Sequence, residues 1–273
     1  MKQQSKKQLR TVLLLVFAIL FMICAIILAW HLLPQYKEVP HIQLDPNAQN
    51  NTAVIDPDTS EVSSLSEESL KSITAAQDMK PKFDALHEKN EGVCAWITIP
   101  GTGVDYEIAR STADEPEDYY LHRGPTKKYR YAGTVYMQKA NVADFTDRNT
   151  VIYGHNMQNG TMFGTLRKYR QRKYFEKNDT IYVYIPGKVL TYKIVSAFAY
   201  DNRNLLYSFD FRDDEQYAKF LKQVTSPKST VKQVNDSISV TTEDRIITLS
   251  TCTGVKSQRY LVVGVLTDEQ PVQ

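Results

Sequence analysis

The sequence predicts a mainly β domain that follows a single membrane-spanning helix. Three observations lead to this prediction: an unbroken apolar run at residues 12–30, a proline-containing polar stretch at 34–64, and about eight short strand-like segments after residue 93. Few helical stretches interrupt those segments, which favours an antiparallel barrel or a sandwich over a doubly wound sheet. At 273 residues the chain has room for one sizeable domain besides the anchor.

The apolar run is predicted to be a membrane anchor. A helix of this length, at 1.5 Å per residue, spans about 28 Å, which matches the bilayer hydrocarbon. Four cations precede the run and no acidic residue comes before Glu38, so residues 1–11 are expected in the cytoplasm, 12–33 in the cell membrane, and the rest outside. A cleaved signal peptide is disfavoured because residues 28–32 lack a good cleavage site. Lipidation at Cys24 is disfavoured because this cysteine lies in the middle of the apolar run.

Residues 34–64 are predicted to form an extracytoplasmic linker. Four prolines stand there among Asn, Gln, Asp, Thr and Ser, a composition that favours an extended spacer over a packed element. The folded domain is then expected to cover residues 65–273.

The domain is predicted to open with two helices. The first begins near Ser66 and places Leu70, Ile73 and Ala76 on one face, at spacings of three residues. Pro81 is expected to end or kink it, and a short second helix follows.

The remainder is predicted to be mostly strands. Two further helical stretches lie near 162–169 and at 213–224, and the second carries apolar residues on one face. The predicted strands cover residues 94–100, 104–109, 133–138, 150–154, 180–185, 189–200, 245–251 and 260–266.

Composition excludes several classes of protein. Without the first eleven residues the chain carries 29 Lys and Arg against 31 Asp and Glu, so the domain has no cationic surplus for nucleic acid. Three cysteines are too few for a disulfide scaffold, and no spacing of Cys or His suggests zinc. Neither a metal nor a cofactor is expected.

A cysteine and an arginine stand at facing strand ends. Cys252 closes an apolar strand, and Arg259 opens the next one after a short connection. If the two strands form a hairpin, these residues lie near-opposite, about 5 Å apart. A guanidinium beside a thiol favours the thiolate and could stabilise an oxyanion. The alternative is a buried core cysteine with an unrelated surface arginine.

A histidine follows another strand end. The strand before it ends at Tyr153 and Gly154, and His155 comes next. At a barrel rim such a histidine could donate and accept protons near neutral pH. Alone, it could equally be a loop histidine that caps backbone groups.

Together Cys252, His155 and Arg259 suit covalent acyl transfer. Cys94 is the other cysteine beyond the anchor, and its place in the first strand suggests a small core residue. A Cys94–Cys252 disulfide is the alternative, and it would silence the nucleophile.

At these residues the sequence resembles the sortases, membrane-anchored cysteine transpeptidases of Gram-positive bacteria. The Thr-Leu-Ser-Thr-Cys of 248–252 resembles the family's TLxTC signature, with Arg259 at the place of its downstream arginine. The Tyr-Gly-His of 153–155 resembles the histidine segment, and 96–102 the first strand. The likeness covers residues 65 to 268.

Within the family, class B is the most similar. The stretch Gly-His-Asn-Met…Gly-Thr-Met-Phe-Gly at 154–164, the helical segment before the first strand and the helix at 213–224 support this. The resemblance implies a closed barrel of about eight strands with N-terminal helices and an inserted helix between late strands. It also implies that four further residues line the substrate site, namely Leu121, Tyr153, Ser250 and Thr251.

The resemblance implies a reaction and partners. The enzyme would cleave the C-terminal sorting motif of a secreted protein after Thr, form a thioester on Cys252, and transfer the protein to an amine. Either a peptidoglycan precursor or a pilin would supply that amine. Two alternatives stay open: a membrane-tethered β-barrel binding module with an inert or paired Cys252, and a cysteine peptidase that releases its product to water.

Overall fold

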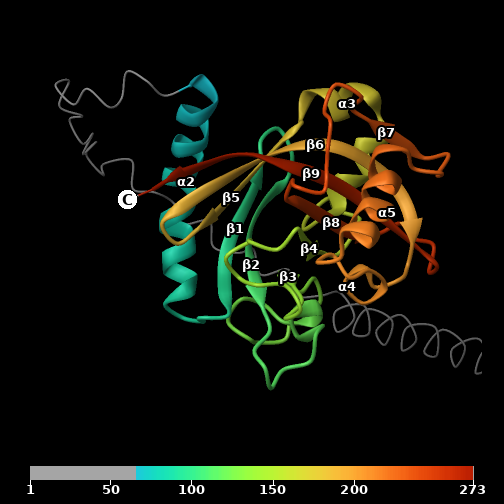
Figure 1. Cartoon of the computed structure of the whole chain (residues 1–273). Helices are drawn as coiled ribbons and strands as arrows, with labels where there is room; N and C mark the ends of the chain where they lie inside the picture. Colours follow the sequence, from blue (N-terminus) through green and yellow to red (C-terminus); the bar gives the residue numbers. More distant parts are fainter. Residues whose placement is uncertain (1–65, 273) are drawn as a thin grey trace, which may run out of the picture. The chain divides into compact units, whose positions relative to one another are not determined.

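A computed structural model of the chain describes residues 66–272, which form a mixed β-sheet with four α-helices and two short 3-10 helices (Figure 1). The strands are β1 (Val93–Ile99), β2 (Val104–Arg110), β3 (Val135–Met137), β4 (Asn149–Tyr153), β5 (Thr180–Ile185), β6 (Lys188–Asp201), β7 (Lys232–Val234), β8 (Ile246–Cys252) and β9 (Gln258–Pro271). The helices are α2 (Glu67–His87), η2 (Tyr119–His122), η3 (Gly164–Arg170), α3 (Arg172–Lys177), α4 (Leu205–Ser208) and α5 (Asp214–Thr225).

The eight predicted strands are all present, with ends that differ by a few residues. β7 was not predicted, because its three residues, Lys-Gln-Val, carry no apolar alternation. The helix expected near 162–169 is instead the 3-10 helix η3 followed by the short α3.

The sheet closes into a barrel. Its strands pair in the order β5-β1-β2-β3-β4-β8-β9-β6, and β6 pairs again with β5, so eight strands of the described chain form a ring. β7 pairs with β6 further along that strand. The closed barrel is confirmed, but the prediction that it is antiparallel is wrong at two pairings. β2 and β3 are parallel, as are β4 and β8. Both pairs join strands that a long connection separates, so no hairpin sets their direction.

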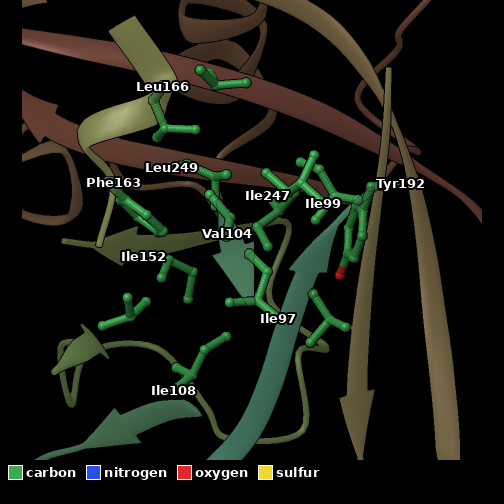
Figure 2. Close-up of a cluster of buried hydrophobic side chains, with 14 of the residues drawn as sticks. Ile97, Ile99, Val104, Ile108, Ile152, Phe163, Leu166, Tyr192, Ile247 and Leu249 are labelled. Carbon is green, nitrogen blue, oxygen red and sulfur yellow. The ribbon is translucent and has the colours of Figure 1, made fainter. Parts of the chain in front are cut away.

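Successive side chains along a strand point alternately into the barrel and toward its outer face. In β8, Ile247 and Leu249 belong to the core inside the barrel, which Figure 2 shows, whereas Ile246 belongs to a second cluster outside. The same alternation places Ser250 and Cys252 on the outer face. Chemistry at Cys252 therefore takes place on the outside of the barrel wall.

Helix α5 covers part of that outer face. Its predicted apolar face is confirmed, because Tyr217, Phe220, Leu221 and Val224 are all buried in the outer cluster with side chains of β6, β8 and β9. The inserted helix thus covers the barrel wall beside Ile246, at the start of β8.

Helix α2 covers another part of the barrel, and it differs from the prediction. Ser66 caps it, and it runs through Pro81 as one helix, so the described chain has one N-terminal helix, not two. Met79 and Phe83, on either side of the proline, pack with Trp96 of the barrel. That packing outweighs the roughly 3 kcal/mol that an internal proline costs. Leu70 is exposed, contrary to prediction, and the buried residues are Ser69, Ser72, Ala76, Met79 and Phe83.

The predicted tail, anchor and linker, residues 1–64, lie outside the described residues. Within 66–272, no helix combines the length and the apolar character that crossing a bilayer requires.

Candidate active site

The β8–β9 hairpin brings the predicted cysteine and arginine together. Cys252 and Arg259 are direct partners in the antiparallel register, so their side chains leave the same face of the sheet. Gly254 in the connecting turn has φ +93°, a conformation that glycine adopts without strain. The predicted near-opposite placement is confirmed.

Both described cysteines are free, which rules out the disulfide alternative. Cys252 is exposed, whereas Cys94 is packed against the barrel core, where its Sγ lies 3.5 Å from the carbonyl oxygen of Ile108. Burial raises the pKa of the Cys94 thiol to about 12, so it stays protonated and unreactive. Cys252 is the accessible thiol of the described chain.

The segment after β4 is fastened to the end of β8. Because β4 and β8 are parallel, Tyr153 lies beside Ser250, and both strands end at the same edge. Thr251 donates a hydrogen bond through Oγ1 to the carbonyl of Gly154 at 2.7 Å. Asn156 donates through Nδ2 to the carbonyl of Cys252, also at 2.7 Å. The residues on both sides of His155 are therefore tied to the strand that carries the cysteine.

Gly154 is required by close packing. A Cβ at this position would lie 2.7 Å from ring carbons of Phe163, closer than real contacts allow. Phe163 is fully buried in the barrel core, so it has no room to move away. Because residue 154 is a glycine, the chain can pack directly against Phe163, and His155 then lies at the rim of the barrel.

His155 is held as a neutral base. Its Nε2 lies 3.0 Å from the carbonyl oxygen of Leu121. Since a carbonyl only accepts, Nε2 carries the proton, and the neutral ring keeps its lone pair on Nδ1. Burial lowers the pKa of His155, and the neighbouring His122 lowers it further, although the bond to Leu121 acts in the opposite direction. The ring is therefore uncharged at neutral pH and can accept a proton.

The connection between β2 and β3 packs against that ring. Tyr131 stacks on His155 with a centroid distance of 6.2 Å and an interplanar angle of 4°. The His122 ring lies 5.3 Å from the His155 ring. Sequence reasoning missed both residues, since nothing in their spacing relates them to His155.

A cavity of about 290 Å³ lies between the residues that follow β4, the β8–β9 hairpin and Leu121. All seven residues singled out in the sequence line it: Leu121, Tyr153, His155, Ser250, Thr251, Cys252 and Arg259. Sequence reasoning missed the rest of the lining, which is Tyr136, Gly154, Leu261 and residues 200–205. The segment 200–205 leaves the end of β6, which pairs with the start of β9, so only the sheet order could have placed it here.

Two tyrosines form one wall of the cavity. The rings of Tyr136 and Tyr153 stack with centroids 5.5 Å apart. Burial raises the pKa of both phenols, so both stay uncharged, although the positive charge of Arg259 acts in the opposite direction. This wall is apolar and aromatic, suited to side chains of an extended peptide.

Arg259 supplies the cavity's positive charge. It is half-buried, and its Nη1 donates to the carbonyl of Gln258 at 3.0 Å. Asp201, the carboxylate of the cavity lining, is paired instead with Arg203, at 2.7 Å. No group of His, Cys, Asp or Glu within 66–272 could hold a metal ion. A thiol, a neutral imidazole and a guanidinium around one cavity can perform nucleophilic acyl transfer.

Comparison with known proteins identifies the family. Residues 97–267 match the family model of the sortase domain, so the chain belongs to the sortase family, whose members are cysteine transpeptidases.

Its relatives point to one class. The chain is 28% identical to Sortase B of Staphylococcus aureus over 191 residues, covering 69% of this chain and 75% of the relative. It is 33% identical to Sortase B of Listeria monocytogenes over 180 residues, covering 64% and 68%. Among solved structures it resembles Clostridium perfringens sortase B, with TM-score 0.60, 30% identity and coverage of 68% and 99%. The class B resemblance seen in the motifs is confirmed.

Proposed function

We propose that this chain is a membrane-anchored transpeptidase that cleaves the sorting motif of secreted proteins after Thr and transfers them to an amine. The observation that carries the proposal is the convergence of Cys252, His155 and Arg259 on one cavity. A solved complex of a relative, the Staphylococcus aureus sortase B-substrate complex, has the same fold, with TM-score 0.61 and 25% identity.

Acylation begins with proton transfer. His155 takes the thiol proton at Nδ1, and the sulfur of Cys252 attacks the Thr carbonyl carbon, forming a C–S bond and an oxyanion. Arg259 stabilises the oxyanion, because its guanidinium is always charged and lies opposite Cys252 in the hairpin. His155 then gives its proton to the departing nitrogen as the C–N bond breaks, and a thioester remains.

Transfer reverses these steps with a different amine. The incoming amine loses a proton to His155 and attacks the thioester carbon, a C–N bond forms, and the C–S bond breaks. The proton on His155 returns to Cys252, so the enzyme is regenerated without a cofactor. Leu121, Tyr153, Ser250 and Thr251 line the peptide's part of the cavity.

In this proposal the anchor keeps the transpeptidase reaction at the extracytoplasmic side of the cell membrane. Residues 12–33 hold the domain at that surface, and the N-terminus lies in the cytoplasm. Emerging substrates and lipid-linked acceptors then reach a high effective concentration near the domain. Cysteine-labelling of intact cells with a membrane-impermeant reagent tests this orientation: Cys252 should react without lysis.

The reaction is tested on the full chain in detergent, with peptides of the LPxTG and NPxTN type, with and without triglycine. A thioester on Cys252 by mass spectrometry and a triglycine-dependent product are expected. Product released only to water would support the peptidase alternative. No adduct on a folded protein whose Cys252 is also inert toward a thiol reagent would support the binding module.

Two variants test the proposed roles of Cys252 and Arg259. Cys252→Ala should abolish product while leaving the melting temperature unchanged, since the side chain is exposed. Arg259→Lys should lose most activity, because a point charge does not reproduce the fork of a guanidinium. Full activity of the lysine variant would reduce Arg259 to a structural role.

A further inference from the structure

One part of the domain surface carries a dense group of positive charges. Residues 164–177, which span η3 and α3, contain six Lys and Arg and a single acidic residue, Glu176. All six cations are exposed, and together they form the cationic end of the domain: Arg167, Lys168, Arg170, Arg172, Lys173 and Lys177. Among the residues that the structure describes, Arg172 alone of the six makes an ion pair, with Glu176 at 2.7 Å. Five exposed positive charges at this end therefore have no carboxylate partner there.

This surplus of positive charge is local. Residues 66–272 contain 28 Lys and Arg against 26 Asp and Glu, which is close to balance. Without residues 164–177 the same range has 22 Lys and Arg against 25 Asp and Glu. Charge that is concentrated in this way attracts anions to one face of a nearly neutral domain.

The domain also begins beside the cationic end. Lys193 of β6 lies 3.3 Å from the carboxylate of Glu68, in the first turn of α2, and 3.6 Å from that of Asp179, two residues beyond α3. One lysine therefore joins the start of α2 to the residues that follow α3, and it pairs with both neighbouring acids. Figure 1 shows the N-terminal end of α2 and helix α3 toward the same end of the molecule, at the top of the view.

The position of this start decides which end of the domain faces the membrane. In the proposed function the chain reaches the domain from the anchor through residues 34–64. A coil of 31 residues has an r.m.s. span of about 30 Å. Helix α2 has 21 residues and is itself about 32 Å long, so its far end lies about that much further from the point of attachment. The cationic end is therefore the part of the domain that the anchor keeps near the membrane.

We propose that the cationic end is a second membrane contact, which docks on the anionic phosphate headgroups of the bilayer that holds the anchor. The inference rests on the anchor of the proposed function and adds an orientation of the domain. Several basic residues together bind an anionic lipid surface, and the attraction acts within about a Debye length of it. Wall polymers also carry phosphate, but the anchor holds lipid headgroups beside this end at high effective concentration.

Lysine footprinting of the full chain tests this contact. The chain is reconstituted in vesicles of phosphatidylcholine, with or without phosphatidylglycerol, and acetylated with a membrane-impermeant reagent before peptide mapping. Lys168, Lys173 and Lys177 should react about three- to tenfold more slowly on the anionic vesicles. Lys89, which is exposed just beyond the far end of α2, should react equally on both. Raising salt from about 0.05 to about 0.5 M should remove the difference.

Removal of two charges identifies the surface. Lys173→Gln combined with Lys177→Gln should restore about half of the lost reactivity of Lys168, on a logarithmic scale. Lys89→Gln with Lys128→Gln is the matched control and should restore none. Both of these lysines are exposed, and Asn90 donates to the carbonyl of Pro125 at 2.7 Å, which brings their two segments together at the far end of α2. Melting curves check that both double variants are folded, and the footprint of the native chain needs no variant.

Equal reactivity of the three lysines on both kinds of vesicle at low salt would overturn the inference, as would protection that extends equally to Lys89. Soluble polyglycerol phosphate is the competing ligand, added to the chain in phosphatidylcholine vesicles. Stronger protection by this polymer than by anionic vesicles would assign the surface to a wall polymer and overturn the membrane contact.

The footprint is independent of catalysis. A chain that forms no thioester but shows the footprint would lose the proposed transpeptidase reaction and keep the membrane contact. Flotation of the vesicles at high salt tests the anchor separately, because an anchored chain stays with them when charges are screened. If the chain is released, the anchor fails, and the footprint at low salt still decides whether the cationic end binds lipid.

Discussion

Asn156 is the residue whose replacement tests the site's geometry most directly. Its Nδ2 donates to the backbone carbonyl of Cys252 at 2.7 Å, and it follows His155 in the chain. This single bond therefore spans the two segments that carry the nucleophile and the base. In Asn156→Ala the bond is lost, and the residue after His155 is no longer fixed to the end of β8.

The expected losses of stability and of acylation rate in Asn156→Ala follow from the strength of this hydrogen bond and from its position. A net hydrogen bond contributes about 0.5–1.5 kcal/mol to the free energy of unfolding. For a domain of this size that corresponds to a melting temperature lower by about 1–6 °C. The effect on catalysis should be larger, because a misplacement of about 1 Å costs on the order of 100-fold in rate. We expect kcat/KM for acylation to fall about 10- to 100-fold.

The assay is single-turnover acylation, followed by mass spectrometry, with a melting curve for each variant. Asn156→Asp keeps the shape but removes the donor, so it should be at least as slow as the alanine variant. Gln158→Ala, an exposed residue of the same turn, is the control and should be unaffected. Acylation of Asn156→Ala within twofold of the native rate would refute the reasoning, whatever happened to the melting temperature.

Three further predictions concern stability, reactivity and pH. Phe83→Ala should lower the free energy of unfolding by about 3–5 kcal/mol in urea titrations, because this side chain is 2% exposed between α2 and the barrel. Iodoacetamide at pH 8 should label Cys252 and not Cys94 in the folded protein, as peptide mapping can show, since the Cys94 pKa is raised to about 12. Because the pKa of His155 is lowered on folding, the unfolded chain takes up the proton first as pH falls below about 6.5, and stability is lost there. His155→Gln should remove this part of the pH dependence, and an NMR titration should place the His155 midpoint below that of a free histidine.

The sequence was most informative where structure is local. The α5 face was predicted correctly because Tyr217, Phe220, Leu221 and Val224 recur at helical spacing, and all four are buried. The same reasoning was only partly right for α2, where Ala76 is buried as predicted but Leu70 is exposed, and Ser69 and Ser72 are buried instead. Which face of a helix is covered depends on the partner surface: Ser69 of α2 donates a hydrogen bond to Asp268 of β9 at 3.2 Å, a contact that apolar spacing does not predict.

The site was predictable to the extent that hairpin geometry is predictable. Cys252 and Arg259 flank one short connection, so their register follows from the sequence once the hairpin is assumed. Tyr131 and His122 surround His155 across a long loop, and Asp201 reaches the cavity through the β6–β9 pairing. No local pattern encodes those contacts, because they depend on which strands become neighbours.

The wrong prediction of an antiparallel barrel has a consequence for catalysis. In an antiparallel β4–β8 pair, the C-terminal ends of the two strands would lie at opposite edges of the barrel. β4 is five residues long, so at about 3.3 Å per residue His155 would then be displaced by about 17 Å from Cys252. Proton transfer requires hydrogen-bonding distance or one bridging water. The parallel pairing, which aligns Tyr153 with Ser250, is therefore what allows two strands far apart in the sequence to deliver a base and a nucleophile to one cavity.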